Sequence, residues 1–243
     1  MAQLQALLIA IQFLTTLPVK LTEPVADKSI GYSLLFYPIV GLIISAILIA
    51  VASLLATQPA SVNAILVLSC WVILTGGLHL DGLADSADAW LGGLGDKSKT
   101  LAIMKDPTSG PIAVSILFLV LAIKWVMLTE LIAEQNYLAI LFAITLSRTA
   151  LPLLFLTTPY VRKNGIGALL INQQPKRLSK QVIVAVAVIS IIFSGFWLLL
   201  ISLALFLLLR YWMQQRLGGT TGDTAGAVVE LIETAVLITA VLF

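Results

Sequence analysis

Charged residues are scarce in this chain, and it has one cysteine and one histidine. Charged side chains make up 11% of its 243 residues, whereas a soluble domain carries about 25%. Hydrophobic residues make up 60%, and the mean hydropathy is +1.06. The single cysteine, Cys70, excludes a disulfide framework and a cysteine-rich metal site. The net charge of +2 is too small to indicate a nucleic-acid partner. This composition predicts an integral membrane protein in contact with the lipid bilayer.

Charge is absent over one long stretch near the N-terminus. Between residues 29 and 80 the ionisable side chains are Tyr32, Tyr37, Cys70 and His79, all uncharged by default at neutral pH. A membrane span needs roughly 20 apolar residues, so this stretch holds two crossings. The first residues also lack the basic segment and the small-residue cleavage site of a secretory signal peptide, so we do not expect a cleaved one.

Charge gaps and turn residues delimit the expected crossings, which are 31–57, 60–80, 111–123, 137–157, 181–209 and 225–243. The apolar segment 4–17 is short and has a polar stripe of Gln5, Gln12 and Thr16. It fits a helix lying in the membrane interface or a buried helix of the bundle. We therefore expect an all-α polytopic membrane protein: a bundle of about six to seven transmembrane helices plus an N-terminal interfacial helix. We expect residues 1–243 to form a single integral membrane domain.

Segment 181–209 determines the topology. As one straight helix it would be roughly 43 Å long, more than the ~30 Å hydrocarbon core requires. A hairpin broken near Ser194 and Gly195 instead places four polar segments on one side, namely 18–30, 81–110, 158–180 and 210–224. Apart from Lys124, at the far end of its span, and Arg148 within a span, all Lys and Arg then share that side, which the positive-inside rule makes cytoplasmic. We prefer the hairpin and expect a protein of a prokaryotic cytoplasmic (inner) membrane with its active site facing the cytoplasm.

Three aspartates follow the second crossing. Asp81, Asp85 and Asp88 are spaced i, i+4 and i+7, which places them on one face of a helix. Like charges on one face repel unless a cation compensates them, and a divalent cation is the natural one. The alternative is a solvated helix end. His79 lies just before them, where a structural histidine is at least as common as a base or a ligand.

Two other motifs lie in polar segments on the same predicted side. Lys105 and Asp106 precede a helix that begins near Pro111. The glycines of segment 218–226 permit close approach of the backbone to a ligand, and the N–H groups of the following helix suit an anion such as phosphate. Asp223 would add a metal ligand. A flexible turn is the alternative.

Charged residues inside the spans are costly and call for a function. Arg148 lies about 16 Å into its span, where it costs roughly 2.5 kcal/mol or more unless paired. We expect it to face the interior and to bind a substrate phosphate or a carboxylate such as Glu230; Glu233 follows Glu230 on the same helix. We interpret the basic segment 158–180 as a topology and lipid-headgroup signal.

Three motifs together resemble the signatures of the cobalamin-5′-phosphate synthase family, and segment 13–19 resembles the opening of that family. The motifs are Gly-Leu-His-Leu-Asp-Gly-Leu-Ala-Asp-Ser-Ala-Asp at 77–88, Ile-Met-Lys-Asp at 103–106 and Thr-Gly-Asp-Thr-Ala-Gly-Ala at 221–227. The resemblance implies an Mg²⁺-dependent adenosylcobinamide-GDP ribazoletransferase. In that reaction a hydroxyl of α-ribazole, or of its 5′-phosphate, attacks the cobinamide-linked phosphate of adenosylcobinamide-GDP and GMP leaves. Pro107, Thr108 and Ser109 depart from the family pattern, which has a basic residue there.

The resemblance and the motifs together define an expected site. We expect Mg²⁺ to bind Asp81, Asp85 and Asp223, because Mg²⁺ prefers oxygen ligands and keeps several waters. Asp88 is expected to be a further ligand or the general base. The expected catalytic residues are Asp88, His79 and Lys105, and the expected substrate-binding residues are Arg148, Thr221, Gly222, Asp106 and Glu230.

Two alternatives remain, one a different membrane enzyme and one from another functional class. The spaced aspartates also resemble those of the CDP-alcohol phosphotransferases, but Ser86 stands where their signature has arginine. A cation-coupled transporter could use Asp81, Asp85, Asp223 and Glu230 as an ion path. Transporters usually have internal repeats and midplane sites, whereas this chain has no repeat and its acidic residues gather at one membrane edge. The sequence leaves open whether the chain forms a homo-oligomer.

Overall fold

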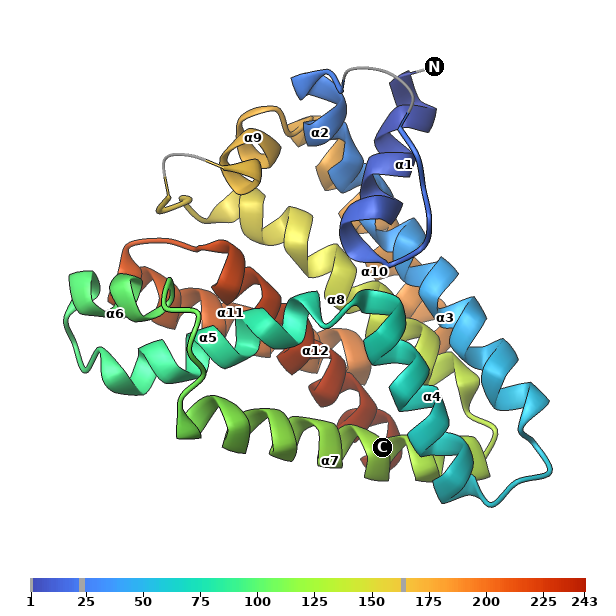
Figure 1. Cartoon of the computed structure of the whole chain (residues 1–243). Coiled ribbons are helices and arrows are strands. Elements are labelled where there is room, and N and C mark those ends of the chain that lie inside the picture. Colours follow the sequence, from blue (N-terminus) through green and yellow to red (C-terminus); the bar gives the residue numbers. More distant parts are fainter. Residues whose placement is uncertain (1, 22–24, 163–164) are drawn as a thin grey trace.

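The polypeptide is built from helices that run across one another in a bundle (Figure 1). The computed structural model describes residues 2–21, 25–162 and 165–243. The helices are α1 (Ala2–Leu14), α2 (Asp27–Ser33), η1 (Leu34–Phe36), α3 (Tyr37–Leu54), α4 (Ala60–Thr75), α5 (Leu78–Gly92), α6 (Lys97–Ile103), α7 (Pro111–Ala133), α8 (Tyr137–Thr157), α9 (Ile166–Asn172), α10 (Lys176–Ser194), α11 (Phe196–Leu217) and α12 (Gly222–Leu242).

The expected fold class is confirmed. Among the described residues, six helical segments are long and apolar enough to cross a membrane: Asp27–Leu54, Pro111–Ala133, Tyr137–Thr157, Lys176–Ser194, Phe196–Leu217 and Gly222–Leu242. The pair α4 and α5 would make a seventh crossing if it counts as one broken span. Helix α1 is apolar but too short to span, and it packs against α2 and α3.

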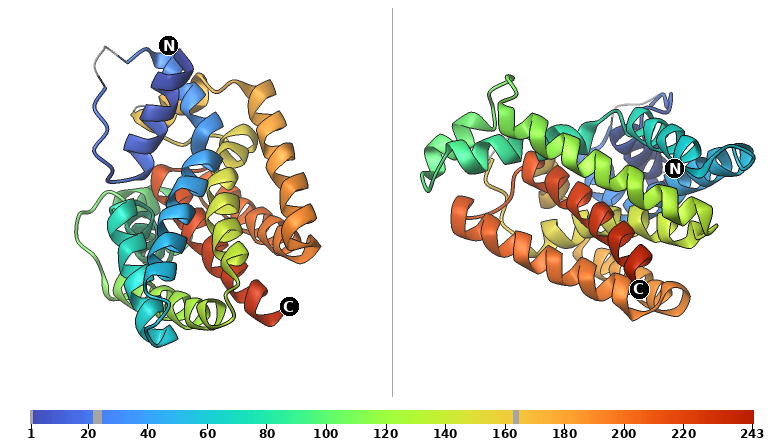
Figure 2. Two further views of the ribbon diagram at one scale, coloured as in Figure 1. Left: turned by 90° about the vertical axis from the view of Figure 1, so that its right-hand side faces the viewer. Right: turned by 90° about the horizontal axis from the view of Figure 1, so that it is seen from below.

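The hairpin in segment 181–209 is also confirmed. Helix α10 ends at Ser194, and α11 begins at Phe196. Gly195 between them has φ of 80°, a left-handed conformation that glycine adopts without strain. The two helices then pack side by side (Figure 2). The polar ends of α5 and α11 therefore lie at the same end of the bundle.

The expected crossing 60–80 is wrong beyond Thr75. Gly76 and Gly77 both have left-handed backbones, with φ of 62° and 67°, and they end α4. Helix α5 then leaves at 87° to α4. Because of this bend, the aspartate-bearing helix turns across the bundle and packs on α7 and α12.

Helices α5 and α12 touch backbone to backbone. A Cβ atom on Gly82 would lie 2.7 Å from the backbone oxygen of Asp223 and 3.2 Å from the Cα atom of Gly226. A Cβ atom on Gly226 would lie 3.2 Å from the backbone oxygen of His79. The crossing of the two helices therefore depends on the absence of a side chain at both glycines.

We predict that Gly82→Ala destabilises the protein, because its methyl group meets a rigid backbone. Overpacking of this kind costs about 1–3 kcal/mol. Gly92→Ala in the same helix is the matched control, since its methyl group would meet only the flexible end of Ile103. Thermal unfolding in detergent measures both variants. Equal midpoints for them would show that the crossing tolerates a side chain.

We also predict that α6 and the end of α11 lie on one side of the membrane. Single cysteines at Ser98 and Gln214, in a Cys70→Ser background, should react with a membrane-impermeant thiol reagent only in inside-out vesicles. The positive-inside rule gives that orientation. Labelling of the two positions from opposite sides would contradict the hairpin topology.

Candidate active site

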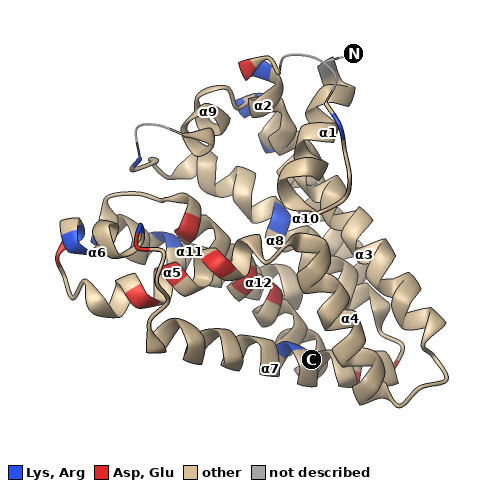
Figure 3. Ribbon diagram, in the orientation of Figure 1, with Lys and Arg blue, Asp and Glu red and all other residues tan. Residues whose placement is uncertain are grey.

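A cavity of about 170 Å³ lies where α5 crosses the start of α12. Its polar lining comes from Tyr37, His79, Asp81, Tyr160 and Asp223. Asp85 lies one helical turn beyond Asp81 and is close enough to Asp81 and Asp223 to repel both. Figure 3 shows the acidic residues gathered along α5 and α12. We call the region around Asp81, Asp85 and Asp223 the carboxylate cleft.

Arg162 faces the carboxylate cleft. The Nη2 atom of Arg162 lies 2.5 Å from Oδ2 of Asp223. The loop after α8 holds Arg162 there, because its backbone pairs with the residues before α12: the N–H of Val161 donates to the carbonyl of Thr220 at 2.9 Å, and the N–H of Thr220 donates to that of Pro159 at 2.8 Å. Segment 158–180 was interpreted as a topology and lipid-headgroup signal. Arg162 in addition contacts a carboxylate of the cleft.

Tyr160 of the same loop also lines the cleft. Its hydroxyl packs against Gly167, where a Cβ atom would lie only 2.2 Å away. Burial raises the pKa of Tyr160 above its ordinary value. The phenol therefore stays protonated at neutral pH and can donate a hydrogen bond into the cleft.

The donor set of the cleft suits a hard divalent cation. Three carboxylates with one guanidinium leave an excess of negative charge, and carboxylate oxygens are the ligands that Mg²⁺ prefers. In the described part of the chain, Asp81 and Asp85 take part in no ion pair. As these side chains stand, no three His, Cys, Asp or Glu groups of the described residues are close enough together to hold a metal ion. A shared cation therefore requires that the carboxylates turn toward one another.

Asp88 has a different task from the one expected. Its carboxylate accepts hydrogen bonds from the backbone N–H groups of Gly110 and Ala113, the latter at 2.9 Å. These are N–H groups at the start of α7, so Asp88 caps this helix. These two hydrogen bonds give Asp88 a structural role, while its expected role as a metal ligand or general base stays a prediction.

Thr221 likewise acts as a helix cap. It is fully buried, and its Oγ1 accepts a hydrogen bond from the N–H of Thr224 at 3.2 Å in a capping box. The same hydroxyl donates to Sδ of Met104 at 3.8 Å. Thr221 therefore fixes the start of α12, whereas the next residue, Gly222, is exposed and lines the cleft.

Lys105 and Asp106 follow Met104 and so lie near the start of α12, but both are exposed and neither lines the cavity. Asp106 accepts hydrogen bonds from the N–H and hydroxyl groups of Thr108, at 3.0 and 2.6 Å. These bonds lower the pKa of Asp106. They form a local turn that precedes α7.

His79 is buried and lines the cleft. Its side chain has 4% of its surface exposed, and Nε2 has no hydrogen-bond partner in the described structure. A buried ring nitrogen without a partner is costly. This atom is therefore available to a ligand in the cavity.

Arg148 faces the interior, as predicted, but its partner is different. Its Nη1 atom forms an ion pair with Oε1 of Glu233. Glu230 pairs instead with Lys124 of α7, whose Nζ lies 2.6 Å from Oε2 of Glu230 and 2.5 Å from Oε2 of Glu233. Lys124 also lies 4.7 Å from the ring centre of Trp71. We call Lys124, Arg148, Glu230 and Glu233 the buried ion network.

This network corrects two expectations. Lys124 is 2% exposed within α7 and is not at the end of a span. Arg148 and Glu230 do not line the cavity, so we remove them from the substrate-binding set. Sequence reasoning missed Arg162, Tyr160, Lys124 and Glu233 as partners in these clusters. For Lys124, the signal in the sequence was a lysine inside an apolar run. Its partners, Glu230 and Glu233, lie far along the chain, so the sequence did not show what it pairs with.

The fold and the cleft define a polytopic helical membrane protein with a carboxylate-rich site at one end of its bundle. The family model described as cobalamin-5-phosphate synthase matches residues 6–241. The chain belongs to this family, which confirms the resemblance predicted from the three motifs.

Curated relatives match over nearly the whole chain. The "adenosylcobinamide-GDP ribazoletransferase" of Pseudomonas fluorescens strain Pf-5 is 51% identical, over 97% of this chain and 98% of the relative. The proteins of the same name from P. fluorescens strain Pf0-1 and Pseudomonas entomophila are 49% and 50% identical, over 97% and 95% of this chain and 98% and 96% of the relatives. No solved structure matches the chain. These relatives favour a ribazoletransferase over a CDP-alcohol phosphotransferase and over a transporter.

We predict that the buried ion network stabilises the folded protein. Arg148→Ala should destabilise the protein by about 3–5 kcal/mol, because it leaves a buried carboxylate without its partner. Adding Glu233→Gln should restore part of the loss, since Lys124 then keeps Glu230 as its counter-charge. Arg210→Ala is the matched control, because Arg210 donates only to the exposed carbonyl of Thr157. Wild-type unfolding of Arg148→Ala would contradict a paired arginine.

Proposed function

We propose that this chain joins adenosylcobinamide-GDP to α-ribazole or its 5′-phosphate in the carboxylate cleft, with release of GMP. In this reaction a ribazole hydroxyl oxygen bonds to the cobinamide-linked phosphorus, and the bond from that phosphorus to the bridging pyrophosphate oxygen breaks. The names of the relatives support the substrates. The observation that carries the location is the meeting of Asp81 and Asp85 with Asp223 across two helices.

Mg²⁺ is the cation that we propose for the cleft. Asp81, Asp85 and Asp223 would hold it, and when bound it neutralises the phosphate oxygens and stabilises the departing phosphate. The rest of its coordination shell is left to water and to substrate, as is usual for Mg²⁺. The excess of negative charge in the cleft supports this choice.

Arg162 would change partner on substrate binding. It pairs with Asp223 in the structure. Once Asp223 turns to the cation, the planar guanidinium of Arg162 is free to make two parallel hydrogen bonds to a phosphate group. Arg162 therefore takes the place that the sequence motifs suggested for Lys105 or Arg148.

Two further groups would prepare the hydroxyl. The unpartnered Nε2 of His79 orients the ribazole hydroxyl by a hydrogen bond, because it lines the cavity from the buried side. The hydroxyl proton would leave to water, because the cleft is open to solvent at the exposed Asp81. We place the cleft on the cytoplasmic side of the inner membrane, which the distribution of Lys and Arg supports.

We predict that Asp85→Asn and Asp223→Asn each lower the rate of GMP release by at least about 100-fold, because each weakens binding of the cation that would stabilise the transition state. The assay uses purified protein in detergent with adenosylcobinamide-GDP, α-ribazole and a titration of Mg²⁺. Asp96→Asn is the matched control, since Asp96 is exposed and caps α6 away from the cleft. Full activity of either cleft variant at limiting Mg²⁺ would exclude that residue as a ligand.

A further inference from the structure

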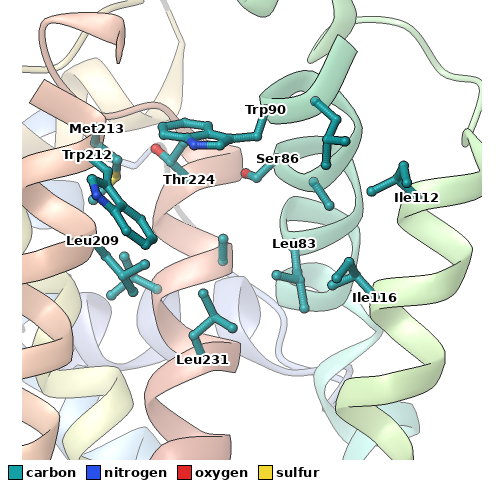
Figure 4. Close-up of a pocket in the computed structure, with 14 residues that line it drawn as sticks. Leu83, Ser86, Trp90, Ile112, Ile116, Leu209, Trp212, Met213, Thr224 and Leu231 are labelled. Carbon is teal, nitrogen blue, oxygen red and sulfur yellow. The ribbon is translucent and has the colours of Figure 1, made fainter. Parts of the chain in front are cut away.

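A second cavity lies on the opposite side of the pair formed by α5 and α12. It has a volume of about 260 Å³ and lies between α7 and α11 (Figure 4). Leu83, Trp90, Ile116, Trp212 and Leu231 form much of its wall, and no charged side chain of the described residues lines it. We call it the apolar groove.

The apolar groove is separate from the carboxylate cleft. Leu83 and Trp90 on α5 point into the groove, whereas Asp81 and Asp85 lie on the opposite side of that helix. On α12, the residues of the groove begin at Thr224, and those of the cleft include Gly222 and Asp223. A ligand in the groove would therefore not touch the carboxylates.

The groove is open to the surface of the bundle. Two side chains of its own wall, Leu91 on α5 and Trp212 on α11, are exposed. Helices α7 and α11 beside it are candidate membrane spans. Acyl chains that pack along these two spans therefore have access to the groove.

Two residues with hydroxyl groups, Ser86 and Thr224, lie at one end of the groove. Figure 4 shows the Ser86 hydroxyl below Trp90 and directed toward Thr224. Because protein atoms cover this hydroxyl, the groove offers a bound molecule apolar surface.

Positive charge gathers beyond this end. The guanidinium of Arg216 lies 5.7 Å from the ring centre of Trp90, and Arg216 follows Trp212 by one helical turn. The Nζ atom of Lys97 lies near the start of the 218–221 loop, 3.2 Å from the position of a Cβ atom on Gly218. A groove with an apolar length and a cationic end is complementary to an amphiphile with a negative head.

We propose that the apolar groove binds one acyl chain of an anionic phospholipid, with its phosphate near Arg216 and Lys97. The volume is smaller than the roughly 300–1,000 Å³ of sites for drug-sized ligands, and it admits a chain segment more readily than a nucleotide. Bound lipid would fill the space between α7 and α11 and support the outer side of α5 and α12.

The test uses purified protein in nanodiscs of phosphatidylcholine with small fractions of phosphatidylglycerol brominated in its acyl chains. Bromine quenches tryptophan fluorescence on contact. We expect quenching that saturates at a low fraction of phosphatidylglycerol and is lost in Trp90→Phe with Trp212→Phe. Trp197→Phe, at the other end of α11, is the control and should leave the saturating quenching in place.

Variants test the two ends of the groove. Ala87→Phe places a ring in it, and exclusion of two methylene groups should weaken binding about tenfold. Ala185→Phe on the exposed side of α10 is the matched control and should have no effect. Lys97→Gln, an exposed change, should weaken binding about fivefold. Equal quenching by brominated phosphatidylcholine, or unchanged binding in both Ala87→Phe and Lys97→Gln, would overturn the proposal.

Discussion

The backbone contact between α5 and α12 is the constraint on which the site depends. Gly82 and Gly226 let two helices that are far apart in the sequence meet without a side chain between them. The contact places the aspartates of α5 opposite Asp223 of α12. The bend at Gly76 and Gly77 is also needed. Without it, α5 would continue in the direction of α4, and its aspartates would not lie across the start of α12.

Buried charges hold α12 in the rotation that this contact needs. The buried ion network joins Lys124 of α7 and Arg148 of α8 to Glu230 and Glu233 of α12. Because unpaired charges in a membrane interior are costly, few other rotations of α12 satisfy all four groups. These four residues fix the position of α12, whereas the role proposed for Asp223 at the start of the same helix is chemical. Asp88 on α5 is another charged residue with a structural role, since it caps α7 while Asp81 and Asp85 face the cleft.

The sequence predicted those features that depend on residues close together in the chain. The i, i+4 spacing of Asp81 and Asp85 placed them on one helical face, and charge asymmetry selected the hairpin at Gly195. Partners across the bundle were not predictable, because periodicity carries no information about which helices meet. Arg148 therefore received Glu230 as its expected partner in place of Glu233, and Arg162 was assigned to the lipid surface. The capping role of Asp88 depends on where the loop before α7 returns, which spacing cannot show.

A structure determined with Mn²⁺ in place of Mg²⁺ tests the shared cation site most directly, because anomalous scattering locates the metal without reference to activity. We expect a peak between α5 and α12, ligated by Asp223 and by Asp81 or Asp85, with Arg162 displaced from Asp223. A peak confined to exposed carboxylates such as Asp96 or Asp106, or no peak at a metal concentration that supports transfer, would contradict a cation held across the two helices.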